Sequence, residues 1–324
     1  MYKERKELFK RLEEKRDSKV ISYITSDRPG LSTQIAEDAV DLFVHHLDKI
    51  QNCKKLTLFL YTRGGNTLAG WRLVNLLRQF FDEIEVIISF KAHSTGTLIS
   101  IGADNIIMTK QATLSPIDPS ITTPLNPIIN GVNGKKEIIP VSVEDIKGFW
   151  DLAKNEYSIQ SEEYKIRVLE ELARKVHPLV LGKAFRARTQ IQMLAERLLT
   201  VHVDDPDKKH KIIDFLTSES GSHDYTIHRK EARDVLGLKV EKPSDDLYDI
   251  IIKIHNDYAD ELHITKAFDP IKGFIGPKDV PFTEKSGFIE SIEGGSHSFS
   301  NTFTKIPREN SQFQIVAKGG WSLE

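Results

Sequence analysis

Residues 56–79 read LTLFLYTRGGNTLAGWRLVNLLRQ, and they join an apolar strand to an amphipathic helix through a pair of glycines. The run 56–61 is short and apolar on both faces, as in a parallel strand that is covered by helices on both sides. The helix predicted over 67–81 carries its apolar side chains on one stripe. Adjacent glycines, Gly64 and Gly65, allow backbone angles that other residues avoid.

The same pattern continues on both sides of this stretch. Strands are predicted at 20–25, 84–89 and 105–109, and helices at 35–50 and 95–103. Strands that alternate with helices at this spacing form βαβ units around a mostly parallel sheet. Right-handed crossovers would wind these units into a superhelical stack, so the sequence predicts an α/β fold.

The flanking segments divide the chain further. Residues 1–19 predict a charged helix, interpreted as solvated, and residues 20–240 are expected to form the main domain. Five prolines between 113 and 142 indicate a long loop region. The periodicity then predicts more helices, at 143–175, 180–200, 208–218 and 229–235. Within the extension 241–324, the tail from residue 266 lacks helical periodicity and predicts an irregular tail of short strands or a partly disordered arm.

The composition excludes several classes of function. A net charge of −2 without a long basic run argues against nucleic acid as a partner. The single cysteine, Cys53, forms no intrachain disulfide and has no Cys/His spacing for zinc, so neither a metal nor a cofactor is expected. The charged N-terminus does not resemble a signal peptide, and no apolar run reaches the roughly 20 residues that span a bilayer. The sequence therefore predicts a cytoplasmic protein.

A second turn, Lys91 to Thr97, follows the strand at 84–89 and places Ser94 where the next helix begins. A serine there is either a simple helix cap or an exposed nucleophile whose following N–H, on Thr95, faces a developing oxyanion. Consecutive parallel strands are neighbours, so the Gly64-Gly65 turn and the Ser94 turn should meet at one edge of the sheet. A hydroxyl beside backbone N–H groups suits acyl transfer.

These two stretches carry a family resemblance. Residues 56–79 and FKAHSTGTLISIGADNIIMTKQATLSPIDPSI (90–121) resemble the Clp-type and signal-peptide-peptidase-type serine proteases of the Clp/crotonase superfamily, and most closely the serine dehydrogenase proteinases. The resemblance covers roughly residues 20–240. It implies that Ser94 is the nucleophile, that the N–H groups of Gly65 and Thr95 form the oxyanion hole, and that the chain is a ββα spiral that assembles into homo-oligomers.

The general base departs from the family pattern, because no histidine occupies residues 113–116. His223 is one candidate, with Asp118 to orient it as a carboxylate orients a triad histidine. Lys135 and Lys136 are the alternatives, and a lysine base would need a pKa lowered by burial.

Three functions follow from these residues. The first is a serine peptidase that acts on peptides or unfolded proteins. The second is a crotonase-type enzyme that acts on acyl-coenzyme A, and the third is a non-catalytic oligomeric scaffold. The chain has no phosphate-binding loop of the G-x-x-x-x-G-K-[ST] type, so any use of ATP would need a separate unfoldase partner.

Overall fold

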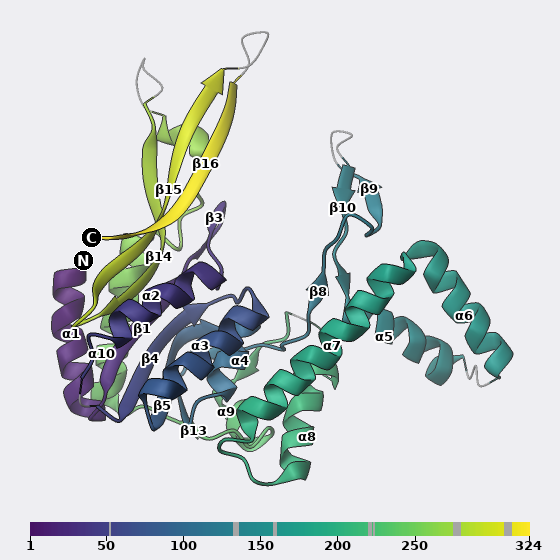
Figure 1. Ribbon diagram of the computed structural model, residues 1–324, viewed down its shortest axis with the longest axis horizontal. Coiled ribbons are helices and arrows are strands. Elements are labelled where there is room, and N and C mark those ends of the chain that lie inside the picture. Colours follow the sequence, from purple (N-terminus) through teal and green to yellow (C-terminus); the bar gives the residue numbers. More distant parts are fainter. Residues whose placement is uncertain are drawn as a thin grey trace. The chain divides into compact units, whose positions relative to one another are not determined.

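A computed structural model describes residues 1–51, 53–131, 136–157, 161–219, 222, 224–274, 280–307 and 313–324 (Figure 1). The chain divides into two compact units. The first combines Met1–Leu114 with Thr226–Glu324, and the second is Ser115–Tyr225. Each unit is described by itself.

The first unit is built on one mixed sheet with the strand order β12-β7-β5-β4-β1-β14-β15-β16. Strands β1 (Lys19–Thr25), β4 (Lys55–Thr62), β5 (Glu83–Ala92) and β6 (Asn105–Met108) pair in parallel, which confirms the predicted core. Their side chains are almost all buried on both faces, because helices cover both sides. The short elements of this unit are β2 (Asp27–Arg28), β3 (Leu31–Ser32), β7 (Thr113–Leu114), β12 (Ile227–His228), α9 (Arg229–Asp234), β13 (Val240–Glu241) and a 3-10 turn at Pro270–Gly273.

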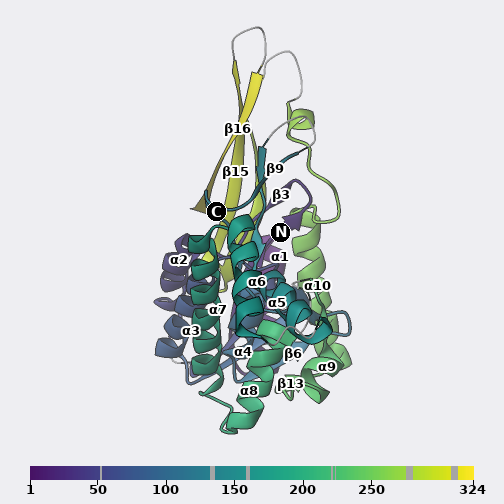
Figure 2. The same cartoon turned by 90° about the vertical axis from the view of Figure 1, so that its right-hand side faces the viewer.

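The C-terminal part of the chain completes this sheet with three antiparallel strands. These are β14 (Phe282–Ser291), β15 (Gly295–Pro307) and β16 (Phe313–Leu323), so the strands are longer than the sequence predicted. Strand β14 pairs with β1, with Ile21 opposite Ser291. Figure 2 shows how β15 and β16 extend together beyond the helices of this unit.

Helices cover both faces of this sheet. Helices α2 (Glu37–Leu47), α3 (Thr67–Phe80) and α4 (Thr95–Ile101) pack in succession on one face. Helices α1 (Tyr2–Arg16) and α10 (Asp245–Glu261) lie against each other on the opposite face.

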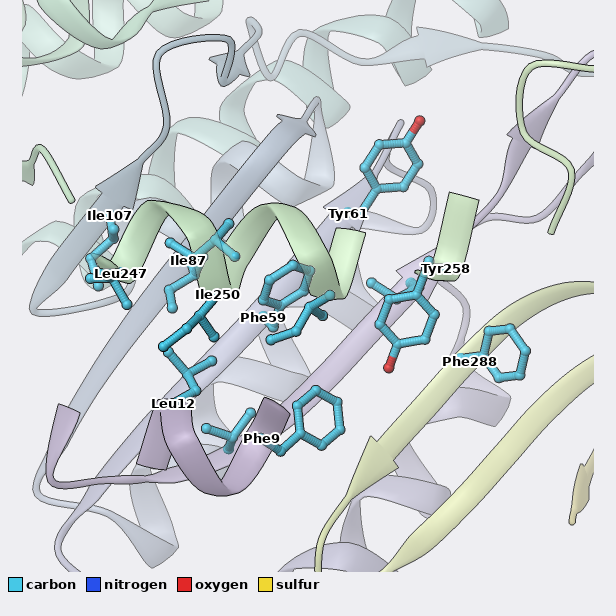
Figure 3. Packing of buried hydrophobic residues seen from close by; sticks show 14 of the residues in the cluster. Phe9, Leu12, Phe59, Tyr61, Ile87, Ile107, Leu247, Ile250, Tyr258 and Phe288 are labelled. Atoms are coloured by element: carbon cyan, nitrogen blue, oxygen red, sulfur yellow. The ribbon is translucent and has the colours of Figure 1, made fainter. Parts of the chain in front are cut away.

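Figure 3 shows the core on the α1–α10 face, where side chains of both helices meet the aromatic and aliphatic residues of β4, β5 and β14. The prediction of a solvated helix at 1–19 is therefore wrong. Its Phe9 and Leu12 are fully buried in this core.

The second unit is mainly helical. It contains α5 (Val143–Asp151), a π-helical turn (Leu152–Glu156), α6 (Glu162–Lys175), α7 (Pro178–Leu199), α8 (Pro206–Asp214) and a second π-helical turn (Phe215–Glu219). The single helix predicted over 143–175 is therefore wrong, because α5 and α6 are separate. The predicted loop region holds two short antiparallel pairs: β8 (Ser120–Ile121) with β11 (Val141–Ser142), and β9 (Ile128–Asn130) with β10 (Lys136–Ile138).

Two buried histidines of the first unit should make its fold sensitive to acid. Burial lowers the pKa of His46, on α2, to about 3, and that of His255, on α10, to about 4. In the unfolded chain both histidines bind a proton near pH 6.5, whereas in the folded chain they stay neutral to a lower pH. The free energy of unfolding therefore keeps its full value above about pH 6.5 and decreases as the pH drops further. We expect a loss of up to about 1.4 kcal/mol per pH unit for each histidine. Urea denaturation between pH 7 and pH 5 measures this slope, and a His46→Gln variant with an unchanged slope would contradict the assignment.

Candidate active site

Ser94 occupies a sharp turn between a strand and a helix. Strand β5 ends at Ala92, and α4 begins at Thr95. The backbone of Ser94 has φ 50° and ψ −114°, a conformation that residues with a Cβ rarely adopt. The turn is closed by a hydrogen bond from the Gly96 N–H to the His93 carbonyl, at 2.8 Å. Ser94 is thus held in strained backbone geometry at the carboxyl edge of a parallel strand, where ligands bind in α/β sheets.

The Gly64-Gly65 turn lies directly against the Ser94 turn, as the sequence predicted. Gly64 has φ 109°, and a Cβ atom built on it would lie 2.8 Å from the Cβ of Ser94 and 2.9 Å from the His93 carbonyl oxygen. Only a glycine fits this approach. The Thr62 hydroxyl accepts a hydrogen bond from the Gly64 N–H at 2.9 Å, and the Thr62 carbonyl accepts one from the His93 N–H at 3.1 Å. The two turns therefore form one packed unit.

Gly65 is fixed by a second close approach. Its φ is 148°, and an added Cβ would lie 2.2 Å from the carbonyl oxygen of Ile35. Ile35 and Gly65 form an isolated parallel β-bridge. Two hydrogen bonds hold it, one from the Ile35 N–H to the Gly64 carbonyl and one from the Asn66 N–H to the Ile35 carbonyl. The Gly65 N–H is not used in either of these two bonds. Asn66 then caps α3, since its side chain accepts a hydrogen bond from the Ala69 N–H at 3.0 Å.

Thr95 links the two candidate oxyanion-hole donors, which are its own N–H and that of Gly65. It is the first residue of α4, so its N–H has no acceptor within that helix. Its hydroxyl donates to the Gly65 carbonyl at 2.8 Å, and its methyl group meets Gly70 of α3, where a Cβ would lie 2.4 Å away. The N–H groups of Gly65 and Thr95 thus belong to two turns that are tied together.

The candidate bases fall elsewhere in the chain. His223 and Lys135 lie outside the described residues. Lys136 is exposed on β10, and Asp118 is buried, both in the second unit. His93, next to Ser94, contacts the Thr113 hydroxyl through its Nε2 at 2.9 Å.

Within the described ranges, no group of three or more His, Cys, Asp or Glu side chains is arranged to hold a metal ion. Across the same part of the chain, no helix has the length and apolar character needed to cross a bilayer.

Comparison with known proteins supports the resemblance seen in the sequence. Residues 1–156 match the family described as ClpP-like SDH-type serine proteinase. This match confirms the resemblance to the serine dehydrogenase proteinases over these residues, and the Clp-type α/β fold with it.

Two uncharacterized proteins of Methanocaldococcus jannaschii also match. One is 28% identical over 58% of this chain and 54% of its own length, and the other is 26% identical over 52% and 59%. The chain therefore spans little more than half the length of these relatives.

Two solved structures also align with this chain. A mutant of the 1510-N membrane-bound stomatin-specific protease aligns with a TM-score of 0.40 and 14% identity, over 67% of this chain and 79% of that chain. A ClpP1 mutant from Listeria monocytogenes aligns with a TM-score of 0.38 and 13% identity, over 73% and 99%.

Replacing Gly65 with alanine should disrupt the turn that lies against Ser94. The new methyl group would collide with Ile35 and displace the turn that carries the Gly65 N–H. Loss of one oxyanion donor costs about 10²–10³-fold in rate, so hydrolysis by a site that uses the Gly65 N–H should fall by at least about 100-fold. The matched control is Gly148→Ala in α5, where nothing lies within 4 Å of the added Cβ. Full activity of Gly65→Ala, measured with a fluorescently labelled casein, would contradict the role of this turn.

Proposed function

We propose that this chain is a serine peptidase that forms an acyl-enzyme on Ser94, with the N–H groups of Gly65 and Thr95 as the oxyanion hole. The observation that carries the proposal is the contact between the two turns. Gly64 packs against the Cβ of Ser94, and Thr95 is bonded to Gly65. The serine proposed as nucleophile and the two proposed donors thus lie on neighbouring strand ends, in a chain whose residues 1–156 match a serine proteinase family, which supports the proposal.

The reaction divides the work among these groups. The Ser94 hydroxyl attacks the carbonyl carbon of the scissile peptide bond and gives its proton to a general base. The two N–H groups stabilise the negative charge that develops on the carbonyl oxygen. Collapse of the tetrahedral intermediate releases the amine, which takes the proton from the base, and water then hydrolyses the ester. We propose His223, oriented by Asp118, as this base, with Lys135 or Lys136 as the alternatives.

A fluorophosphonate probe tests the proposal directly, because it reacts covalently only with an activated serine. We expect one probe per chain, which peptide mapping by mass spectrometry assigns to Ser94. Denatured protein is the control, since its serines are not activated. A folded protein that the probe does not label would contradict the peptidase proposal. The alternative functions would then be an enzyme that acts on acyl-coenzyme A or a non-catalytic scaffold.

The same reagent identifies the base. Among His223→Gln, Lys135→Met and Lys136→Met, only the variant that lacks the base should lose labelling, by about 10²–10⁴-fold in rate. Equal loss in all three would indicate a general effect on the fold and would contradict a single base.

We further propose that the substrates are peptides or unfolded polypeptides and that the active form is a cytoplasmic homo-oligomer. Support comes from the ClpP-like family match alone.

An ATPase unfoldase partner is part of the same proposal. If peptides are cleaved without ATP but folded proteins are not, the chain needs such a partner. Cleavage of folded proteins without ATP would contradict the proposal of an unfoldase partner. Mass photometry distinguishes the oligomer from a 36.8 kDa monomer.

A further inference from the structure

Strand β5 contains an irregularity just before the Ser94 turn. Its regular pairing with β4 ends where Leu60 lies opposite Ile88, and it resumes where Thr62 lies opposite Ala92. One residue of β4, Tyr61, therefore faces three residues of β5, which form a bulge at 89–91. At the same place β5 leaves β6 and pairs with β7 instead. Bulges of this kind redirect a strand and occur often beside active sites.

Each of the three bulge residues is held by its side chain on the α1–α10 face of the sheet. The Ser89 hydroxyl lies 3.0 Å from Nδ1 of His255. The Phe90 ring stacks on the His255 ring with a centroid distance of 4.0 Å and an interplanar angle of 23°. The Lys91 ammonium donates to Oδ2 of Asp27 at 2.6 Å. Two residues, Asp27 and His255, thus hold the side chains of all three bulge residues.

The holding groups are themselves fixed. The Tyr61 hydroxyl donates to Oδ1 of Asp27 at 2.7 Å, and the Tyr61 ring lies 5.3 Å from the His255 ring. Figure 3 shows Tyr61 with its hydroxyl pointing away from the apolar cluster. Burial would raise the pKa of Asp27, but hydrogen bonds from Lys91 and Tyr61 lower it overall. Burial and the charge of Lys91 lower the pKa of His255, so its ring is neutral where it stacks on Phe90.

We infer that Asp27 and His255 are positioning residues that brace the bulge and so hold Ser94 in its reactive orientation. The inference rests on the proposed function of Ser94. The backbone at Ser94 has a positive φ, and such strain persists only where the surroundings over-determine it. The braced residues end three positions before Ser94, and a misplacement of about 1 Å at a reacting group costs roughly 100-fold in rate. His255 lies on α10, outside the residues that match the family.

The test compares Asp27→Asn and His255→Phe with the unmodified chain. The amide in Asp27→Asn would keep an acceptor for Tyr61 and lose the charge that holds Lys91. The phenyl ring in His255→Phe would keep the stack and lose the contact with Ser89. We expect the rate of fluorophosphonate labelling and kcat for casein to fall 10- to 100-fold, with KM changed by less than threefold. If Asp27 acts through Lys91, the labelling rate of the double variant Asp27→Asn/Lys91→Met should be no lower than that of Asp27→Asn or of Lys91→Met.

The matched control is Asp104→Asn. Asp104 is also paired with a cation, Arg78 of α3, at 2.6 Å, and it also holds β5, but by accepting a hydrogen bond from the N–H of Ile84 near the opposite end of the strand. This variant should label at the rate of the unmodified chain. Labelling losses in Asp104→Asn equal to those in Asp27→Asn, or unchanged labelling in Asp27→Asn and His255→Phe, would overturn the inference. If the unmodified chain is not labelled, the proposed function fails instead, so the two failures are distinguishable.

Discussion

Replacing Ser94 with alanine should lower the hydrolysis of labelled casein by about 10⁴-fold or more while the fold is kept. A serine nucleophile has no substitute in acyl-enzyme formation, and only binding and the oxyanion hole would continue to act. The alanine side chain fits the same space and suffers the same positive φ as the serine. The circular dichroism spectrum of the variant should therefore match that of the unmodified chain.

Two further variants sharpen this result. Ser94→Gly should be equally inactive but more stable by about 1 kcal/mol, since glycine adopts a positive φ without strain. Ser100→Ala is the matched control, because Ser100 is a buried serine of α4, the helix that follows Ser94, and its hydroxyl donates to the Gly96 carbonyl at 2.7 Å. That variant should lose about 1 kcal/mol of stability and keep its activity. An active Ser94→Ala protein would exclude the acyl-enzyme route.

Replacing Arg5 with methionine should destabilise the first unit by about 3–5 kcal/mol, the cost of leaving a buried charge without its partner. The Arg5 side chain is fully buried, and its Nε and Nη2 donate to the two carboxylate oxygens of Glu290 at 2.8 and 2.7 Å. It also donates to Glu261 and lies over the Tyr258 ring, 4.3 Å from the centroid. This one side chain joins α1, α10 and β14. Urea denaturation measures the loss.

A double variant separates the charge from the packing. In Arg5→Met/Glu290→Gln, the carboxylate that faced Arg5 is replaced by a neutral amide, so part of the stability should return. The control is Arg72→Met. The ion pairs of Arg72 with Glu37 and Asp41 are exposed and contribute little to stability, so this variant should unfold at nearly the same urea concentration as the unmodified chain. A double variant as unstable as Arg5→Met would show that the loss comes from packing alone.

The parallel core and the meeting of the two turns could be predicted because both depend on local patterns. Buried strands near 20, 56, 84 and 105 are visible as apolar runs, and neighbouring parallel strands bring their ends together. Helix α10 was missed, although Leu247, Ile250, Ile251, Ile254 and Tyr258 carry the helical spacing that would have indicated it.

The brace around the bulge could not be predicted in the same way. Asp27 and His255 are separated by more than 200 residues, and each looks like an ordinary polar residue of a turn or a helix. Their partners depend on two extra residues in β5, which no periodicity reveals. Similarly, the burial of Arg5 follows from three carboxylates that α10 and β14 supply, and the charged segment 1–19 by itself favoured a solvated helix.

The pairing of β14 with β1 sets an order of events during synthesis (Figure 1). Strand β1 is made first, but the strand that covers one of its edges follows more than 250 residues later. At about 5–20 residues per second, that edge stays open for roughly 15–50 s on the ribosome. An open edge of a β-strand is a site for wrong pairing with other chains. The growing chain should therefore depend on chaperones until residue 291 has emerged. Ribosome-bound chains stalled before and after that residue would show the difference as protection of the β1 amides from hydrogen exchange.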